Sequence, residues 1–307
     1  MAAEVLDSSA DPLRAIPSSA LRQRMRAIAL MCAATIFFAA LDTSAKSLSG
    51  VLPAIEIIWA RYVAAAIIGL IAVRPFAHPT VFRSSRPTLQ IVRSLLLLGS
   101  TTANFLALRQ LQLAETSTIN FLTPLFVVLL AGPLLGEWAG GARLVAVSIG
   151  FIGVIVATGP GTSAFHPVVL IAIAGVLCNA GYALATRMLA RFDSSSTTLT
   201  WTPLAGVALL TPVLPFLWVS PPTLTALAIM VGMGVFGALG HWLLILAHER
   251  APASVLTPFG YTQLLWMILS GLLVFGDRPS AAVLFGAGIV VACGLYLIWR
   301  ERAERAR

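Results

Sequence analysis

Charged and hydrogen-bonding side chains occur inside long apolar stretches of this sequence. Asp42 and Lys46 lie four positions apart in an apolar segment that begins at Ala27, and Arg61 lies deep within the following segment. A charge at the centre of a bilayer costs on the order of 2.5 to 3.5 kcal/mol, so such residues must be paired, hydrated or in contact with a ligand. In a membrane-embedded chain these residue types can anchor an anion or a carbonyl group, form ion pairs or move protons.

A second group of candidate residues combines an amide with aromatic rings. Gln263 and Trp266 are three positions apart, which places them on one face of a helix, and Tyr261 lies close to that face. An amide fixes the orientation of a planar ligand, whereas aromatic rings stack on many ring types. The residues expected to bind a small molecule are Trp59, Arg61, Asn120, Asn179, Tyr182, Tyr261, Gln263 and Trp266.

Each of these residues also has a purely structural interpretation. Arg61 can pair with Glu56 or Asp42, and Trp59 can belong to the belt of aromatic residues at a membrane surface. The asparagine and glutamine amides can bond neighbouring helices, and the remaining aromatic side chains can pack between them. Both interpretations therefore stay open for each residue.

The composition indicates a membrane protein. The chain has 307 residues, of which 58% are hydrophobic and 10% are charged, whereas about a quarter of the residues of a soluble domain are charged. The net charge of +8 does not indicate nucleic acid, because the basic residues lie in short loops and at the two ends of the chain. The three cysteines form no CxxC pair, so no metal site, disulfide or cofactor is expected. The sequence therefore predicts an all-α polytopic membrane protein.

Ten segments are long and apolar enough to span a bilayer, which takes about 20 residues. The expected transmembrane helices are 27–47, 53–73, 89–109, 114–136, 142–159, 167–187, 196–218, 222–246, 253–275 and 281–299. With the N-terminus inside, the outer loops hold only Lys46, Arg109 and Arg278, while almost all other Lys and Arg residues fall inside. Basic residues concentrate on the cytoplasmic side, so both termini are expected in the cytoplasm.

The sequence also contains an internal repeat. "LLAGPLLGEW" (129–138) in the first half aligns with "ILSGLLVFGDR" (268–278) in the second, so that Glu137 matches Asp277. The expected organisation is a cytoplasmic tail (1–26), a first five-helix repeat (27–159), a second repeat (167–299) and a basic tail (300–307). An odd number of spans inverts the second repeat relative to the first. Inverted repeats are typical of secondary transporters.

Four residues are candidates for gating or for proton coupling. Asp42 and Lys46 have the spacing of a local ion pair on one helix face, and Asp42 and Glu56 are expected to form an acidic rim at the outer surface. His241 follows Gly234, Gly237 and Gly240 and can carry a proton, because the pKa of histidine lies near neutrality. The alternatives are a salt bridge that ties the first two spans together and a histidine that serves packing.

Three segments are similar to a known family. "WARYVAAA" (59–66), "FLALRQLQLAETSTINFLTPLFVVLLAGPLLGE" (105–137) and "FGYTQLLWMILSGLLVFGDRPS" (259–280) occur in the order and spacing of the drug/metabolite transporter superfamily, EamA type. The opening "FFAALDTSAKSL" with "WARY" resembles most the riboflavin and S-adenosylmethionine carriers. The resemblance implies a bacterial inner-membrane carrier of small metabolites with a central cavity lined by both halves.

The predicted function is therefore a secondary transporter, for which import of a riboflavin-type or S-adenosylmethionine-type compound and export of an amino acid or other metabolite are both open. The expected partners are a small-molecule substrate and the lipid bilayer, with a second copy of the chain as a further candidate and no nucleic acid. An intramembrane enzyme is disfavoured, because "HERAP" (248–252) lacks the second histidine of HExxH. A channel is disfavoured because no filter segment or ring-forming charged helix is visible.

Overall fold

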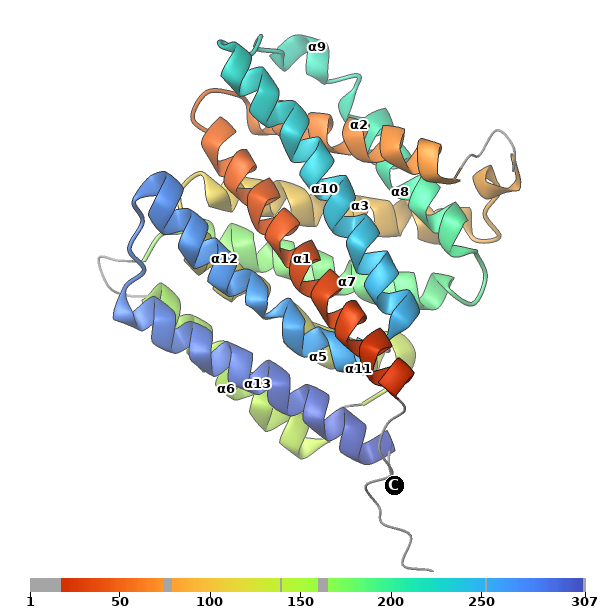
Figure 1. The fold of residues 1–307 in the computed structure, drawn as a ribbon, viewed down its shortest axis with the longest axis vertical. Coiled ribbons are helices and arrows are strands. Elements are labelled where there is room, and N and C mark those ends of the chain that lie inside the picture. The colour runs from red at the N-terminus through yellow and green to blue at the C-terminus, as the bar shows by residue number, and fades with distance from the viewer. Residues whose placement is uncertain (1–17, 74–78, 139, 160–164, 252, 306–307) are drawn as a thin grey trace, which may run out of the picture.

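The computed structural model describes residues 18–73, 79–138, 140–159, 165–251 and 253–305, and every regular element in these ranges is a helix (Figure 1). The long helices are α1 (Ser18–Leu48), α2 (Ala54–Val73), α3 (Pro87–Leu108), α5 (Thr123–Leu135), α6 (Gly141–Thr158), α7 (Val168–Leu189), α8 (Ser195–Leu210), α10 (Leu224–Arg250) and α13 (Ala281–Arg305). The short ones are η1 (Pro79–Phe82), α4 (Leu113–Asn120), α9 (Leu214–Leu217), α11 (Ala253–Gly260), α12 (Thr262–Ser270) and the π-helical turn η2 (Gly271–Phe275).

Within the described ranges, nine helical segments are long and apolar enough to cross a membrane, where the sequence predicts ten. The difference lies in the expected span 196–218, which is divided into α8 with 16 residues and α9 with 4 residues. Pro212 and Pro215 stand at this division. Proline has no backbone N–H and its ring clashes with the preceding turn, so one continuous helix cannot form there.

Two other expected spans are also interrupted, each near its first third. The span 114–136 is divided into α4 and α5, and the span 253–275 is divided into α11, α12 and η2. Pro124 lies in the first turn of α5, where its missing N–H costs nothing, and Pro258 lies inside α11 just before the break. The two prolines therefore stand at the interruptions of these spans.

The N-terminal region differs from the prediction. A tail was expected up to residue 26, but α1 begins at Ser18, so residues 18–26 extend the first helix. Residues 1–17 lie outside the described ranges. A stretch such as "SSALRQRMR" contains no proline or glycine and several good helix formers, which allows the apolar helix to continue into a basic turn.

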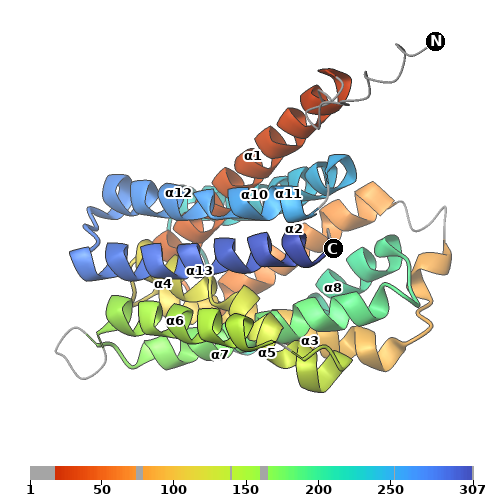
Figure 2. The ribbon, with the colours of Figure 1, turned by 90° about the horizontal axis from the view of Figure 1, so that it is seen from below.

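The helices pack in pairs that match across the two halves of the chain. α1 packs along α10, and α7 packs along α3. α2 contacts α8, and α6 lies beside α13 at one side of the bundle (Figure 2). We call the end of the bundle at which α1 begins and α13 ends the N-terminal end, and the other the far end.

Several local features of the first half recur at matching positions in the second half. α4 and α11 have eight residues each, and both are followed by a break. Gly136 and Gly276 close α5 and η2 with φ values of 74° and 69°, a conformation in which a side chain would clash with the backbone. The N–H of the residue after each glycine donates to the carbonyl six residues back, at 3.1 and 3.0 Å. Both helix ends are thus closed by the same motif.

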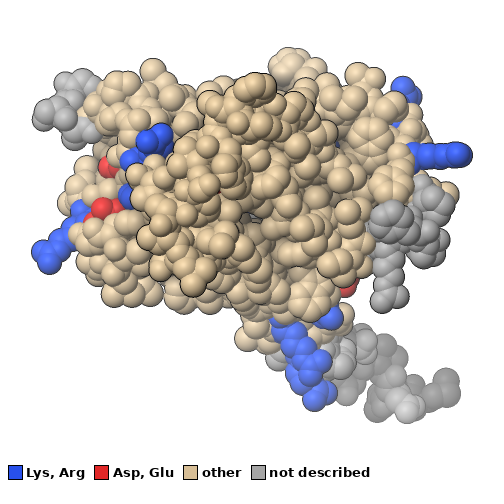
Figure 3. Space-filling model, turned by 90° about the horizontal axis from the view of Figure 1, so that it is seen from above, with Lys and Arg blue, Asp and Glu red and all other residues tan. Residues whose placement is uncertain are grey.

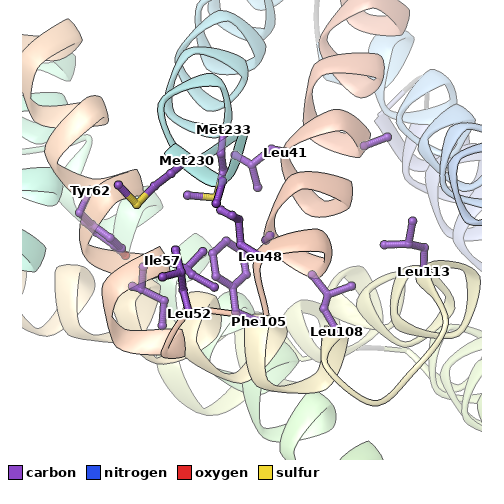
Figure 4. Close-up of a cluster of buried hydrophobic side chains, with 14 of the residues drawn as sticks. Leu41, Leu48, Leu52, Ile57, Tyr62, Phe105, Leu108, Leu113, Met230 and Met233 are labelled. Carbon is purple, nitrogen blue, oxygen red and sulfur yellow. The ribbon is translucent and has the colours of Figure 1, made fainter. Parts of the chain in front are cut away.

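A cluster of buried apolar side chains fills the far end, as Figure 4 shows. Leu48 at the end of α1, Leu108 at the end of α3 and Leu113 at the start of α4 are at most 1% exposed. Ile57 of α2 and Met233 of α10 complete the cluster from the other side. The outer surface is different: the broad face seen in Figure 3 carries almost no charged side chains, and Lys and Arg lie around its rim. An apolar surface between charged rims is what a lipid bilayer requires.

Candidate functional site

A cavity of about 400 Å³ lies between α2, α3, α7, α8 and α10. Its lining comes from the parts of these helices that lie nearer the N-terminal end, such as the second half of α2, the first half of α3 and the second and third turns of α8. The polar and aromatic lining residues are Arg61, Tyr62, Arg93, Tyr182, Thr202, His241 and Trp242. This volume and mixture of groups are those of a small-molecule site.

Glycines of α10 bring this helix close to its neighbours beside the cavity. A Cβ atom on Gly234 would overlap the methyl group of Ala64 in α2, and one on Gly237 would lie 2.8 Å from Leu41 in α1. Gly240 likewise packs against the ring of Phe38. The absence of side chains at these three positions therefore permits the close approach of α10 to α1 and α2.

Arg93 is held rigidly at the cavity wall. Its Nε donates to Oγ1 of Thr186 at 2.6 Å and its Nη2 to the hydroxyl of Tyr182 at 2.8 Å, while Nη1 donates to Oγ1 of Thr202. The guanidinium carbon lies 4.5 Å from the centroid of the Tyr182 ring, and the residue is 3% exposed. Hydroxyl oxygens and an aromatic face therefore stabilise this charge. Among the described residues, Arg93 forms no ion pair.

Arg61 lies in the same cavity with fewer partners. Its Nη1 donates to Oγ1 of Thr101 at 3.4 Å, and its guanidinium carbon lies 5.6 Å from the centroid of the Phe105 ring. The ion pair with Glu56 or Asp42, which the sequence left open, does not form among the described residues. Arg61 is thus a cation at the cavity surface with unused donors.

His241 and Tyr182 are the other two predicted residues that line the cavity. His241 of α10 stands edge-on to Phe38 of α1, with ring centroids 5.0 Å apart. Trp242 beside it is 56% exposed and stands at the edge of the cavity. The structure therefore brings together Arg61, Tyr182 and His241 from three different helices.

The predicted pair of Asp42 and Lys46 does not form. Instead, Nζ of Lys46 lies 3.1 Å from Oδ2 of Asp277 and donates to the carbonyl oxygen of Leu111 at 2.8 Å. The ammonium group also lies 5.0 Å from the centroid of the Phe275 ring. The long lysine side chain reaches across the far end to the residue that follows η2 and its closing glycine. The spacing of Asp42 and Lys46 on one helix could not reveal this distant partner.

Asp42 belongs to a chain of amides in the middle of the bundle. Its Oδ1 accepts from Nδ2 of Asn104, whose Oδ1 accepts from Nδ2 of Asn120, at 3.2 and 2.9 Å. Nearby, Nδ2 of Asn179 donates to Oγ1 of Thr123 at 3.2 Å. These bonds join α1 to α3 and α4, and α7 to α5, and none of these side chains lines the cavity.

Glu56 does not form an acidic rim with Asp42. It is fully buried at the start of α2, and its Oε2 accepts from the backbone N–H of Val219 at 3.2 Å. Asp42 is also buried, at 7% exposure. The loop before α10 covers Glu56 through this hydrogen bond, so no acidic rim is exposed there. The two carboxylates instead bond the loop before α10 and helix α3.

The amide and aromatic cluster of the ninth span lies apart from the cavity. Tyr261 stands edge-on to Phe121 with ring centroids 4.8 Å apart, and Trp266 packs on the apolar cluster of the far end. The hydroxyl of Tyr261 and Nε1 of Trp266 are buried without a hydrogen-bond partner. Gln263 is half-buried on α12. These three residues lie on or next to α12, and Arg61 lies elsewhere, in the cavity.

Trp59 lies at the far end, outside the cavity. Its Nε1 donates to Oγ1 of Thr211 at 3.0 Å, and its ring stands edge-on to Trp218 with centroids 6.1 Å apart. Trp218 is 42% exposed. This position agrees with the alternative interpretation of Trp59 as a residue of an interfacial aromatic belt.

Sequence reasoning did not select Arg93 or Thr202. The signal was present, because Arg93 is a charged residue within an expected span, which is a functional-site candidate by default. What the sequence did not show is that α7 and α8 place three hydroxyl groups around it.

A second ion pair lies at the N-terminal end. The two terminal nitrogens of Arg187 in α7 donate to the two carboxylate oxygens of Glu137, at 2.8 and 2.7 Å. Both side chains are about half exposed, whereas those of Lys46 and Asp277 are 15% and 22% exposed. In the alignment of the two repeats, Asp277 is the counterpart of Glu137 at an offset of 140 residues, and Arg187 is the counterpart of Lys46 after a shift of one residue. The two ion pairs thus occupy matching positions in the two halves.

A polar cluster outside the spans joins the two loops at this end. Asp193, between α7 and α8, accepts hydrogen bonds from Oγ of Ser84, the N–H of Ser85 and Nε2 of Gln90. Partial desolvation raises the pKa of Asp193, but these hydrogen bonds outweigh it and hold the pKa below its ordinary value of 3.8. The carboxylate therefore fixes the start of α3 to the loop before α8.

Comparison with known proteins gives consistent results. The chain is 25% identical over 291 residues to the S-adenosylmethionine uptake transporter of Rickettsia felis, with 94% of this chain and 98% of that protein covered. It is 27% identical over 260 residues to the riboflavin transporter of Brucella anthropi, with 81% and 89% covered, and 31% identical over 188 residues to that of Vibrio cholerae, with 60% and 62% covered. A solved crystal structure has a TM-score of 0.58 over 92% of this chain and 97% of its own, at 22% identity, which shows a shared fold.

The model of the EamA-like transporter family matches residues 25–159 and again residues 166–300. The two matches cover nearly all of the sequence, and the matched relatives of named function are transporters. The resemblance seen in the sequence is thereby confirmed. The chain is a multi-pass membrane transporter, not an enzyme, and it belongs to the EamA-like transporter family.

Proposed function

We propose that this transporter is a secondary carrier that moves a small organic metabolite across the bacterial plasma membrane by alternating access. In this proposal the N-terminal end faces the cytoplasm, because Lys and Arg residues concentrate there. The cavity then occupies the cytoplasmic half of the bundle, and the apolar cluster closes the outer end. The structure would correspond to an inward-facing state.

The observation that supports the proposal is a difference in helix packing between the two ends of the bundle. When the two repeats are aligned, α1 corresponds to α7, α3 to α10, α4 to α11 and α5 to α12. At the far end, α1 packs against α3, and α4 packs against α12. The corresponding pairs, α7 with α10 and α5 with α11, make at most marginal contact. A carrier built from two inverted repeats would exchange such contacts between its two states.

The two ion pairs support the same interpretation. At the far end Lys46 joins Asp277 to the carbonyl of Leu111, and we call this set of contacts the Lys46 bridge. At the N-terminal end, Arg187 bonds Glu137 and no other residue in the part of the chain that the structure describes. In the same alignment, the counterpart of Leu111 is Ala251. The proposal therefore includes a bond from Arg187 to the carbonyl of Ala251 when the cytoplasmic end closes.

The named relatives suggest which substrates to test first. S-adenosylmethionine and riboflavin are the compounds in their names, so import of a compound of either type is the first hypothesis. Export of an amino acid or another metabolite is the second, since a cavity in the cytoplasmic half can also load a substrate for export.

Reconstitution of the purified chain into proteoliposomes tests the proposal. Liposomes that contain a carrier and are preloaded with unlabelled substrate should accumulate labelled substrate by counterflow. Liposomes that contain a channel should not. We expect counterflow for at least one compound of a panel that contains these two, amino acids and other metabolites, and none in empty liposomes. Counterflow that fails with both compounds and with a panel of amino acids and other metabolites would overturn the carrier hypothesis.

Two further arms of this assay address particular residues. Transport that is indifferent to an imposed pH gradient would remove proton coupling, and with it the role of His241 as a proton carrier. Gln263→Leu tests the amide cluster of α12. Unchanged transport in this variant would exclude Gln263 from substrate binding and leave the cavity with Arg61 as the single site.

A further inference from the structure

The charge of the cavity lining restricts what it can bind. The lining contains two guanidinium groups, those of Arg61 and Arg93, one imidazole and no carboxylate among the described residues. Resting on the carrier function proposed above, we propose that the substrate is an organic anion with a planar ring, whose negative group binds to Arg61.

The two arginines are not equivalent as ligands. A guanidinium group has five N–H donors in a planar fork. Arg93 uses three of its nitrogens for hydroxyl acceptors and stacks on Tyr182. Arg61 makes one long hydrogen bond of 3.4 Å to Thr101. Arg61 therefore retains the paired donors that bind a carboxylate through two parallel hydrogen bonds.

No protein carboxylate at ion-pair distance compensates the charge of Arg61 among the described residues. Asp42 interacts with it electrostatically, but it forms no ion pair with Arg61 and does not line the cavity. Oδ1 of Asp42 is bonded to Asn104 instead. A cation in an apolar surrounding is costly unless a counter-charge or water accompanies it. An anionic substrate supplies this counter-charge.

The rest of the lining fits a flat ring. Tyr62 and Trp242 contribute aromatic surfaces from α2 and α10, and Leu97 and Leu199 contribute apolar ones. Aromatic and apolar walls with few oriented polar groups are typical of sites for planar ligands.

The cavity lining matches neither of the compounds in the relatives' names well. A substrate with a net positive charge, such as S-adenosylmethionine, would have to enter beside two guanidinium groups without a carboxylate to meet it. A neutral ring would stack but would gain no ion pair with Arg61. The cavity thus favours an anion over both.

Three probes that share one ring test the proposal. Indole-3-acetate is an anion, indole-3-acetamide is neutral and tryptamine is a cation at neutral pH. Each is titrated against the purified full chain in detergent, and the Kd is obtained from the shift of the thermal unfolding midpoint. We expect the acetate to bind at least about tenfold more tightly than the acetamide, and tryptamine to bind most weakly.

Variants assign this preference to one residue. Arg61→Gln should bring the acetate and the acetamide to the same affinity, and Arg61→Lys should keep a preference for the acetate. Arg109→Gln, which removes an exposed arginine outside the cavity, should leave all three affinities unchanged.

The proposal is overturned if tryptamine binds as tightly as the acetate, if none of the probes binds, or if Arg61→Gln weakens all three by the same factor. The order of the three probes is measured on the unaltered chain, so it decides the matter even where Arg61→Gln fails to fold. Counterflow in proteoliposomes separates the two proposals. Transport with a preference for cations would sink the anion inference alone, whereas absence of transport would sink the carrier function.

Discussion

Arg61 and Arg93 lie in one cavity but serve it differently because of what surrounds them. Hydroxyl groups of α7 and α8 and the ring of Tyr182 hold Arg93, while Arg61 has one long hydrogen bond. Both residues fall within expected spans, but sequence reasoning selected only Arg61, which lies deep in its span. Depth is visible in a sequence, but the partners of a side chain are not, because they come from helices far away in the chain.

Replacing Arg93 by methionine should destabilise the protein. Methionine keeps much of the side-chain volume. It leaves the partly buried hydroxyl oxygens of Tyr182 and Thr186 without the N–H donors of Arg93. We expect the free energy of unfolding in detergent to fall by about 1 to 3 kcal/mol. Arg109→Gln is the matched control, and an unchanged unfolding midpoint in Arg93→Met would show that these hydrogen bonds add no stability.

Asp193 gives a prediction for the pH dependence of stability. Its pKa is below 3.8 in the folded protein, so its contribution is complete above that pH and is lost as the pH falls through the lower folded value. Asp193→Asn should therefore unfold at a lower temperature than the unaltered protein at pH 7. The two midpoints should converge as the pH drops below about 4. A difference that stays constant down to pH 3 would contradict the assignment.

At the scale of the element, glycines and prolines decide how the helices meet. Pro212 and Pro215 divide the expected span 196–218, and this break is why nine segments long and apolar enough to span a membrane are found in the described ranges instead of ten. Small residues let α6 and α13 approach so closely that the carbonyl of Gly153 lies against Gly286. Helix association in a bilayer depends on such packing, because the lipid offers no hydrophobic driving force.

Gly286→Val should disrupt the packing of α6 on α13. A Cβ atom at this position would meet the backbone of Gly153 and the methyl group of Ala157. Overpacking of this kind costs about 1 to 3 kcal/mol, which a lower thermal unfolding midpoint would show. Gly288→Val is the matched control on the same helix, since nothing lies within 4 Å of a Cβ there. Equal effects of the two changes would exclude a packing cause.

The Lys46 bridge should hold the far end closed. In a background without native cysteines, Leu108→Cys places a thiol in the buried cluster at this end. Adding Lys46→Gln should speed its labelling by a membrane-impermeant maleimide from outside about fivefold, as expected for a loss of about 1 kcal/mol in closure. Arg278→Gln, an exposed charge near the same end, should leave the rate unchanged. Equal rates in both variants would show that the bridge does not stabilise closure.

At the scale of the whole molecule, two halves with matching helix pairs and matching ion pairs are closed at one end only. α1 with α10 repeats as α7 with α3, and Lys46 with Asp277 repeats as Arg187 with Glu137. The family model also matches the chain twice. In the proposed function, the asymmetry between the ends, rather than the repeat itself, corresponds to one state of a two-state cycle.

The orientation of the molecule is testable independently of transport. A green fluorescent protein fused after Arg307 should fluoresce in cells, because it folds in the cytoplasm, and alkaline phosphatase at that position should be inactive. Phosphatase inserted after Gln110, between α3 and α4, should be active. The reverse pattern would place the N-terminal end outside and turn the proposed inward-facing state into an outward-facing one.

The sequence by itself determined the class of protein, most of the spans and the family. These follow from composition and from apolar runs, which act locally along the chain. Only the tertiary structure decided that Lys46 bonds Asp277 instead of Asp42, that Glu56 is buried, and that Arg93 joins Arg61 in the cavity. Each of these depends on which distant helix lies opposite a side chain, and spacing along one helix does not contain that information.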